Sequence, residues 1–288
     1  MARPHPDLDR LLRTIRGAPP GPVLVLGTVD SGKTTLVQDL AAALLAEGPV
    51  DVAGADMGQA WLGPPTMMGR ARLARIPPDW ARVRPERLFF VGDTSPAVDL
   101  DLCVETLARL LTEGVEPRAR ILVDTPGLAV GRLAEAFWRA AARRIGGAAV
   151  VGIQSGRELE PVLGPFRQSG ACLVTCRPAT GVRPRDHQER ADFRQVAYAR
   201  YFRPGRLRWA GRARLRVEPA APSLSAGLVP GRLVGLACGG RDLALAVVRA
   251  AGPKRLGLVT PLVSLAGVDR VRVGALCVDP ATGRETRA

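Results

Sequence analysis

The chain has 288 residues, of which 47% are hydrophobic and 24% are charged, and its formal net charge is +14 at pH 7. This length can bury one large core, or one core with a small second domain, and the lack of an apolar run of about 18 residues excludes a membrane-spanning helix. Five scattered cysteines do not form a disulfide framework and the N-terminus lacks the pattern of a secretory leader, so we expect a cytoplasmic protein without a membrane partner.

In chain order, the hydrophobic pattern predicts an amphipathic helix at 8–16 and a Gly/Pro break at 17–22, followed by alternating strands and helices. We expect strands at 23–26, 50–55, 88–91, 121–124, 148–153 and 171–175, and helices at 35–47, 99–111, 133–144 and 158–168. This alternation indicates an α/β fold. Its doubly wound, mostly parallel sheet would bind ligands at the carboxyl ends of the strands.

The pattern changes beyond Trp209, where Gly and Pro turns separate short β-rich pieces at 214–217, 233–237, 243–248, 256–259 and 268–278. No helix of ordinary length is expected among them. We therefore expect a short N-terminal helix and linker at 1–20, an α/β domain at 21–212 and a small β-rich C-terminal domain at 213–288.

Residues 27–34 fit the phosphate-binding pattern G-x-x-x-x-G-K-[ST], between a predicted strand and a predicted helix. Glycines let backbone N–H groups converge on an anion, and the helix N-terminus adds positive partial charge. We expect Lys33 to reach the β- and γ-phosphates of a nucleotide and Thr34 to bind Mg²⁺. The other residues assigned to the nucleotide are Gly27, Thr28, Val29, Asp30, Ser31, Gly32 and Thr35.

The choice of basic residues supports this interpretation. Only Lys33 and Lys254 are lysines, so 39 of the 41 basic residues are arginine, yet a lysine stands where the phosphate-binding loop requires one. The guanine-reading pattern Asn/Thr-Lys-x-Asp is absent, and these two lysines cannot provide it. ATP is therefore the expected nucleotide of a P-loop NTPase fold.

Two aspartates close predicted strands near the expected phosphate-binding loop. Asp124 ends the strand at 121–124 and fits the acid that holds a Mg²⁺-bound water in P-loop proteins, although apolar strands that end in aspartate are common. Asp56 follows the strand at 50–55 and is placed to accept a proton from an attacking hydroxyl. The alternative for Asp56 is a turn-forming role ahead of Gly58.

The segment 183–216 concentrates positive charge and aromatic side chains. It contains 11 arginines, three acidic residues and five of the 12 aromatic residues of the chain. Arginine interleaved with aromatics suits phosphate contact combined with base stacking. The alternatives are a solvated helix with an apolar inner stripe, or an arginine content set by genome composition.

Three motifs accompany the phosphate-binding loop: Asp56-Met57-Gly58-Gln59 with Gly63-Pro64-Pro65, Phe90-Val91-Gly92-Asp93-Thr94-Ser95-Pro96, and Asp124-Thr125-Pro126-Gly127-Leu128. Together they resemble the polynucleotide 5′-hydroxyl kinases. That family includes the kinase associated with pre-mRNA 3′-end cleavage and tRNA splicing, the ribosomal-RNA-processing kinase, and archaeal and bacterial relatives. The resemblance spans about 21–205 and continues more loosely at 271–285.

The resemblance implies transfer of the γ-phosphate of ATP, with Mg²⁺, to the 5′-hydroxyl of RNA or DNA. Lys33 and Asp56 would be catalytic, and Asp56 would orient and activate the hydroxyl. Arg190 and Arg194 would also be catalytic, because they match the Arg-x-x-x-Arg of a lid, placed here at about 183–205, which closes over ATP. The resemblance also implies that the nucleic acid is bound by Gln59, Thr125, Pro126 and Gly127.

This sequence departs from the family pattern at two positions. Gly54 stands where the family often has a second acid, and Leu128 stands where tryptophan is common. These departures concern catalytic rate and substrate preference more than fold.

Two other functions compete with the kinase. One is an ATP-binding scaffold of a nucleic-acid-processing complex without turnover, and the other is a P-loop ATPase that inserts metals or targets proteins. The metal-insertion or targeting class would be expected to carry His/Cys clusters or a second loop lysine, and the sequence has neither. The combination of Lys33, Asp56 and the two lid arginines favours the kinase.

Overall fold

The computed structural model describes residues 4–145, 149–179 and 183–287. The chain forms two compact units. The first comprises Met1–Asp56, Gly69–Glu86 and Val104–Arg185, and the second comprises Met57–Met68, Arg87–Cys103 and Asp186–Ala288. The residue predicted to start the strand at 148–153 lies outside the described residues.

The first unit is built from strands and helices that alternate along the chain. Its strands are β1 (Pro22–Gly27), β2 (Val50–Gly54), most of β3 (Met67–Leu73), β5 (Ile121–Asp124), β6 (Ala149–Ile153) and β7 (Cys172–Cys176). Its helices are α1 (Leu8–Gly17), α2 (Lys33–Leu44), the 3₁₀ turn η1 (Trp80–Arg82), most of α3 (Leu100–Thr112), α4 (Arg132–Ile145) and α5 (Glu160–Gln168).

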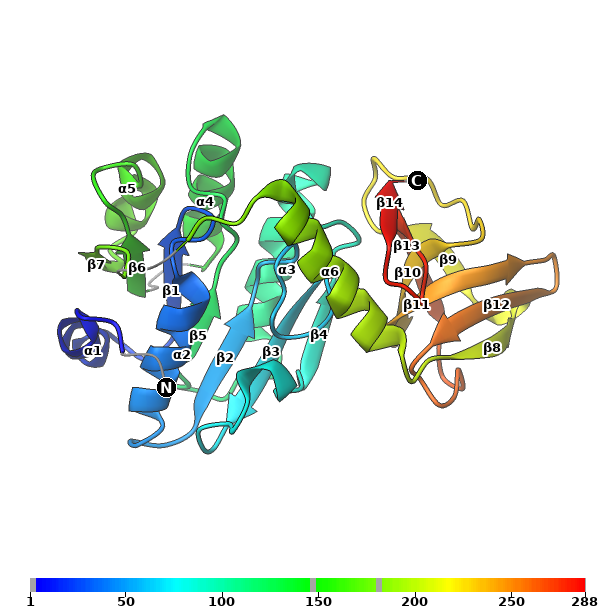
Figure 1. Ribbon diagram of the computed structural model, residues 1–288, viewed down its shortest axis with the longest axis horizontal. Coiled ribbons are helices and arrows are strands. Elements are labelled where there is room, and N and C mark those ends of the chain that lie inside the picture. Colours follow the sequence, from blue (N-terminus) through cyan, green and yellow to red (C-terminus); the bar gives the residue numbers. More distant parts are fainter. Residues whose placement is uncertain (1–3, 146–148, 180–182, 288) are drawn as a thin grey trace. The chain divides into compact units, whose positions relative to one another are not determined.

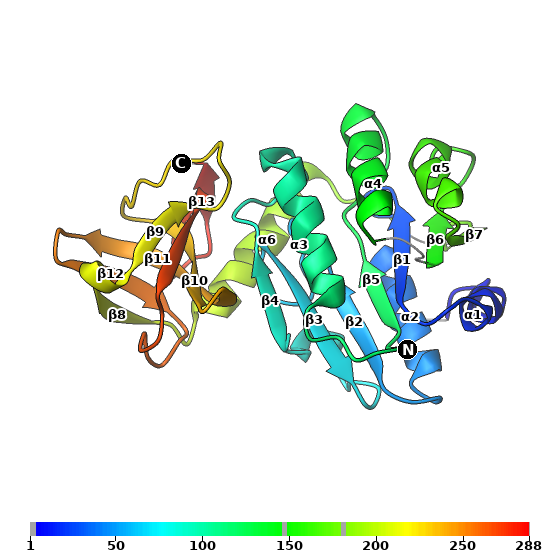
Figure 2. The ribbon, with the colours of Figure 1, turned by 180° about the vertical axis from the view of Figure 1, so that it is seen from behind.

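These strands lie in the order β3-β2-β5-β1-β6-β7. Strand β1 pairs in parallel with β5 and β6, β2 pairs in parallel with β5, and β6 pairs in parallel with β7. Helix α2 lies on one face of the sheet, and α3 and α4 lie on the other (Figure 1 and Figure 2). The predicted doubly wound, mostly parallel sheet is therefore confirmed. Strand β3, which runs antiparallel to β2, was not predicted.

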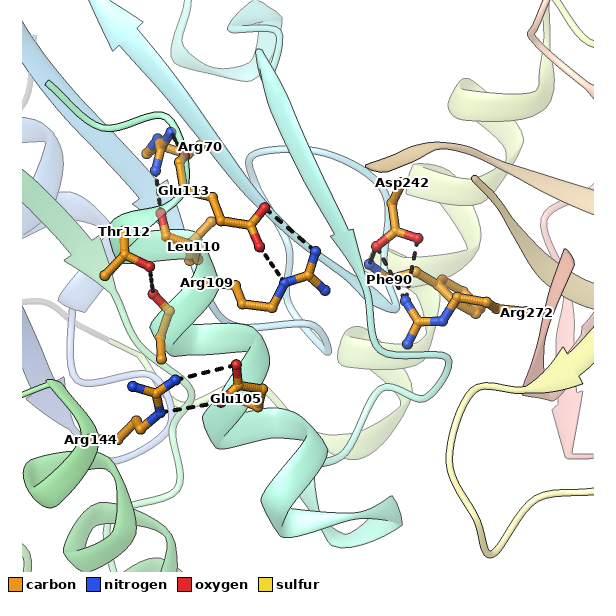
Figure 3. A network of polar contacts seen from close by, with 11 residues as sticks. Arg70, Phe90, Glu105, Arg109, Leu110, Thr112, Glu113, Arg144, Asp242 and Arg272 are labelled. Atoms are coloured by element: carbon orange, nitrogen blue, oxygen red, sulfur yellow. Dashed lines mark hydrogen bonds and ion pairs between the residues drawn. The ribbon is translucent and has the colours of Figure 1, made fainter. Parts of the chain in front are cut away.

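A buried arginine explains why the sequence pattern missed β3. Arg70 interrupts the apolar pattern of 67–73, yet it is only 5% exposed. Its guanidinium donates to the carbonyl oxygen of Leu110 near the end of α3 (Figure 3). It also donates to the carbonyl oxygens of Glu113 and Gly114, just beyond the helix. These bonds compensate the buried charge and use carbonyls that a helix end leaves without intrahelical partners. The strand therefore tolerates a charged residue in its interior.

The second unit is rich in β structure. Its strands are β4 (Arg87–Phe90), β8 (Arg206–Gly211), β9 (Arg216–Pro219), β10 (Arg232–Cys238), β11 (Arg241–Ala251), β12 (Arg255–Thr260), β13 (Arg270–Val278) and β14 (Glu285–Arg287). Its helical elements are α6 (His187–Phe202) and the 3₁₀ turns η2 (Pro96–Val98) and η3 (Arg212–Arg214). The order β14-β13-β10-β11-β12-β8 is antiparallel throughout, and β9 pairs in parallel with β13.

Successive residues of the central strands of this sheet point to opposite faces, and each face has its own core. Leu233 and Val247 pack with Tyr198 and Phe202 of α6, whereas Val234 and Val248 belong to a separate cluster. Helix α6 therefore covers one face of the second sheet.

Asp242 links β4 to this sheet. It is 6% exposed, and its carboxylate accepts hydrogen bonds from the backbone N–H of Phe90 and from the Arg272 guanidinium (Figure 3). The same guanidinium lies 5.6 Å from the centre of the Phe90 ring. The buried carboxylate is thus paired by a backbone donor and by a cation, as burial requires.

The predicted β-rich pieces all correspond to strands, but the β structure begins earlier, because β8 starts at Arg206 and pairs with β12. Arginine and apolar residues alternate at 206–209, which is the period of a strand. The division of the chain at 20 and 212 stays a prediction, because the two compact units reflect spatial contacts rather than independent folding. None of the helices in the described part of the chain has the length and apolar character needed to cross a bilayer.

Candidate active site

The loop between β1 and α2 has the backbone geometry of an anion site. Gly32 caps α2 with a φ of +92°, a conformation that favours glycine. At the other end, a Cβ atom on Gly27 would lie 2.3 Å from Ser31 Oγ. Gly32 is therefore favoured by the turn that places the N-terminus of α2 toward a ligand, and Gly27 leaves the space that the Ser31 hydroxyl occupies.

Lys33 is buried in this loop, with 6% exposure, and its Nζ donates to the carbonyl oxygen of Thr28 at 2.7 Å. Burial lowers the pKa of its ammonium group, whereas the charges of Asp124, Asp56 and Asp30 favour the protonated form. A desolvated cation at the start of a helix attracts the phosphates of a nucleotide.

Thr34 and Asp124 present oxygen ligands of the kind that Mg²⁺ prefers. Thr34 Oγ1 donates to Asp124 Oδ2 at 2.6 Å, and Asp124 is 1% exposed at the end of β5. Mg²⁺ is usually held by one or two carboxylates together with substrate phosphates. The two side chains therefore fit this ion, and their hydrogen bond keeps them side by side.

Ser31 fits a nucleotide phosphate. Its side chain is 5% exposed, and its Oγ has no hydrogen-bond partner in the described part of the chain. A buried hydroxyl without a partner costs free energy, and a phosphate oxygen would accept its proton. Together with the two loop glycines and Lys33, it supports the nucleotide site predicted from the sequence.

Asp56 lies at the same carboxyl edge of the sheet. Ala55, which precedes it, donates its N–H to the carbonyl oxygen of Asp124 at 2.8 Å. The Asp56 carboxylate is also close enough to Lys33 to favour its charged form. The structure thus brings together Lys33, Thr34, Asp56 and Asp124 in the first unit.

The predicted substrate residues 125–127 contact the phosphate loop. Thr125 Oγ1 donates to the carbonyl oxygen of Val25 in β1 at 2.7 Å. A Cβ atom on Gly127 would lie 2.9 Å from the Cα of Val29. Leu128 follows, and its carbonyl oxygen accepts the indole N–H of the buried Trp138 at 2.6 Å.

Arg185 is a contact that sequence reasoning missed. Both its backbone N–H and its Nε donate to the Asp30 carboxylate, at 2.8 and 2.9 Å. Asp30 has a φ of 55° at the tip of the loop, and its side chain is 4% exposed. The residue that ends the first unit is thus fixed to the phosphate loop. No spacing in the sequence indicates this pair.

The other predicted site residues belong to the second unit. Arg190 and Arg194 lie one helical turn apart on α6, and Gln59 Nε2 donates to the carbonyl oxygen of Arg190 at 3.3 Å. A capping box formed by Asp186 and Glu189 starts this helix. The helix therefore begins just before the predicted lid arginines, and its local sequence specifies that start.

Arg194 pairs with a carboxylate that the sequence did not single out. Its Nε and terminal nitrogen lie 2.7 and 2.6 Å from Glu285 Oε1, and the two side chains are 15% and 17% exposed. The turn that carries Glu285 lies against α6, because a Cβ atom on Gly283 would lie 1.9 Å from the carbonyl oxygen of Gln195. Strand β14 therefore fixes the position of a predicted catalytic arginine.

The same short strand also contacts the motif at 90–96. Arg287 forms an ion pair at 3.1 Å with Asp93, whose side chain is 1% exposed. Asp93 also accepts the N–H of Ser95 at 3.0 Å. Hence β14 connects α6 with one of the motifs that marked the resemblance.

Comparisons with known proteins show which family and which relatives this chain resembles. The family described as mRNA cleavage and polyadenylation factor CLP1 P-loop matches residues 27–204. A polyribonucleotide 5′-hydroxyl-kinase of Pyrococcus furiosus is 25% identical over 189 residues, which is 65% of this chain and 52% of the relative. A protein of the same description from Methanocaldococcus jannaschii is 28% identical over 187 residues, covering 64% of this chain and 51% of the relative.

Among solved structures, a chain of the wild-type Clp1p–Pcf11p complex superposes with a TM-score of 0.71 at 14% identity, covering 94% of this chain and 78% of that chain. This likeness concerns the fold. This chain spans about half the length of the archaeal relatives it matches.

Proposed function

The chain belongs to the mRNA cleavage and polyadenylation factor CLP1 P-loop family, and on that premise we propose that it is an ATP-dependent polynucleotide 5′-hydroxyl kinase. The observation that supports this proposal best is the grouping of Lys33, the Thr34–Asp124 pair and Asp56 at one edge of the sheet. A site that only binds a nucleotide would need the phosphate-binding loop but no second carboxylate. Asp56 is such a second carboxylate, and it is suited to remove the proton of an attacking hydroxyl.

In the proposed reaction, a bond forms between the 5′-oxygen of the nucleic acid and the γ-phosphorus of ATP, and the bond to ADP breaks. Lys33 binds the β- and γ-phosphates, and Asp56 accepts the proton of the 5′-hydroxyl. When bound, Mg²⁺ would supply positive charge at the phosphate oxygens, with Thr34 and Asp124 as its protein ligands. Phosphoryl transfer of this kind depends mainly on positioning and charge neutralisation.

We assign the remaining predicted residues to substrate binding and charge stabilisation. Thr125, Pro126 and Gly127 would contact the terminal nucleotide, together with Gln59. Arg190 and Arg194 would stabilise charge that develops on the transferred group. RNA is the first substrate to test, because the archaeal relatives are described as polyribonucleotide kinases.

The deciding experiment incubates the protein with Mg²⁺, ATP labelled at the γ-phosphate, and RNA or DNA oligonucleotides in single- and double-stranded form. Label should enter strands with a 5′-hydroxyl and not matched strands with a 5′-phosphate. Lys33→Ala serves as the negative control. If the protein binds ATP but labels no strand, an ATP-binding scaffold without turnover is the better description.

A further inference from the structure

Strand β8 presents apolar side chains to solvent. Trp209 is 53% exposed and Leu207 is 45% exposed. In the described sheet, β8 is the last strand of the order and pairs along one side with β12. Because side chains alternate along a strand, Leu207 and Trp209 lie on the same face.

The Trp209 ring is supported from one side by a glycine. Gly257 is its cross-strand partner, and a Cβ atom there would lie 3.1 Å from both Cη2 and Cζ3 of the ring. The six-membered ring thus lies against the backbone of β12, in space that only glycine leaves. Since half of the side chain remains exposed, the opposite ring face is open to solvent.

A cavity of about 760 Å³ continues this surface toward α6. Val259, which lines the cavity, is the cross-strand partner of Leu207 and therefore shares its face. On the helix side, Val196, Arg200 and Arg203 line the cavity, and none of its lining residues is acidic. Arg255 pairs with Gly211 on the same face of the strands and is exposed.

We name as the Trp209 surface the residues Val196, Arg200, Arg203, Leu207, Trp209 and Arg255, and we propose that it binds a single strand of nucleic acid. A base stacks on the open face of Trp209, and the phosphates lie near the three arginines. The identity of the polymer rests on the proposed function. Base–aromatic stacking accepts every base, and arginines attract phosphates without regard to sequence.

The combination of a flat ring and positive charge favours nucleic acid over an acidic peptide. Arginines attract either polymer, but the exposed indole of Trp209, which contacts the position of Gly257 on one side, offers a flat surface that matches the planar face of an unpaired base. A duplex keeps its bases stacked on one another, so the surface suits single strands.

The first test measures equilibrium binding of a fluorescent single strand of about 12 nucleotides that already carries a 5′-phosphate, so that no transfer takes place. Trp209→Ala should weaken binding roughly 5- to 150-fold, the equivalent of one lost base–aromatic stack. Trp209→Phe should retain most of the affinity. Trp80→Ala, at a partly buried tryptophan of η1, serves as the matched control.

The second test changes the charge of the same surface. The triple variant Arg200→Gln, Arg203→Gln, Arg255→Gln should reduce the slope of log affinity against log salt by about 2, because fewer counterions are released from the strand. The exposed Arg13 of α1 provides the control as Arg13→Gln, which should leave the slope unchanged. Because these arginines are exposed, their substitution should leave the fold intact. The second test therefore remains informative even if Trp209→Ala unfolds the protein.

Normal affinity in Trp209→Ala, or a normal salt slope in the triple variant, would overturn the proposal, as would tighter binding of an acidic peptide than of the strand. The result is separable from the proposed kinase. Weaker binding by Trp209→Ala and a smaller salt slope in the triple variant, with no phosphate transfer by the wild type, would support the surface and refute the kinase. Phosphate transfer by the wild type, with unaltered strand binding by the variants, would support the kinase and refute the surface.

Discussion

The phosphate-binding loop and helix α6 both carry cations suited to phosphate, but they position them in different ways. Lys33 is buried at 6% exposure, with its ammonium bonded to its own loop and bordered by carboxylates at strand ends. Arg194 lies on a helix and depends on Glu285, which is distant in the chain. The first cation is positioned by local backbone and sheet geometry, and the second by tertiary packing. The two regions should therefore respond differently to substitution.

The largest effect is expected in the loop. Lys33→Ala should reduce phosphate transfer by about 10³-fold or more, because it removes the charge expected at the β- and γ-phosphates. Circular dichroism and the unfolding midpoint should match wild type, since the backbone defines the loop. Wild-type amounts of product from this variant would contradict the site.

A second substitution tests the proton acceptor beside the loop. Asp56→Asn should lower turnover by about 10²–10⁴-fold, the range for a lost general base, while the affinity for ATP changes little. Initial rates over a range of ATP and RNA concentrations separate the two quantities. Turnover equal to wild type would return Asp56 to a turn-forming role.

The metal ligand should behave differently from the base. Asp124→Asn should also slow transfer, but raising the Mg²⁺ concentration should restore part of the rate, because the lesion lies in metal affinity. Rates are measured across a Mg²⁺ titration with Asp56→Asn in parallel. Equal rescue of both variants would argue against separate roles.

For the helix, Glu285→Gln should lower turnover on the order of tenfold and the free energy of unfolding by about 1.5–3 kcal/mol, because Arg194 loses a charged hydrogen-bond partner. A double-mutant cycle with Arg194→Gln measures the coupling. Glu218→Gln is the control, since Glu218 pairs with the more exposed Arg216 and Arg270. A variant that lost stability alone would limit Glu285 to a structural role.

The smallest effect concerns pH. Burial lowers the pKa of Lys33 below 10.5 in the free protein, and bound phosphates should raise it again. Nucleotide affinity should therefore be constant at lower pH and decline by at most about tenfold per pH unit as the pH rises through the lowered pKa. In Lys33→Arg, whose side chain stays protonated, this decline should be absent. Titrations with a fluorescent nucleotide from about pH 7 to about pH 10.5 test this difference.

The sequence predicted the features that local patterns specify. The spacing from Gly27 to Thr34 placed the boundary between β1 and α2, and the apolar run before Asp124 placed the end of β5. These predictions succeed because hydrophobic periodicity and turn-forming glycines act over a few residues.

Contacts between distant segments were beyond this reasoning. Asp30 and Arg185 are 155 residues apart in the chain, and Arg194 and Glu285 are 91 apart. In an arginine-rich chain every acid has many possible partners, so only packing selects one. Arg70 likewise could not be recognised as a strand residue without the carbonyl groups that receive its charge.

The contact between Gly127 and the phosphate loop limits which sequences this chain can accept. Any side chain at 127 would meet the backbone of Val29 at 2.9 Å, so reducing Val29 to a smaller residue would not make room for it. Two motifs about a hundred residues apart therefore share one mutational constraint. In a library of variants, position 127 should tolerate glycine alone, whereas position 29 should accept several side chains.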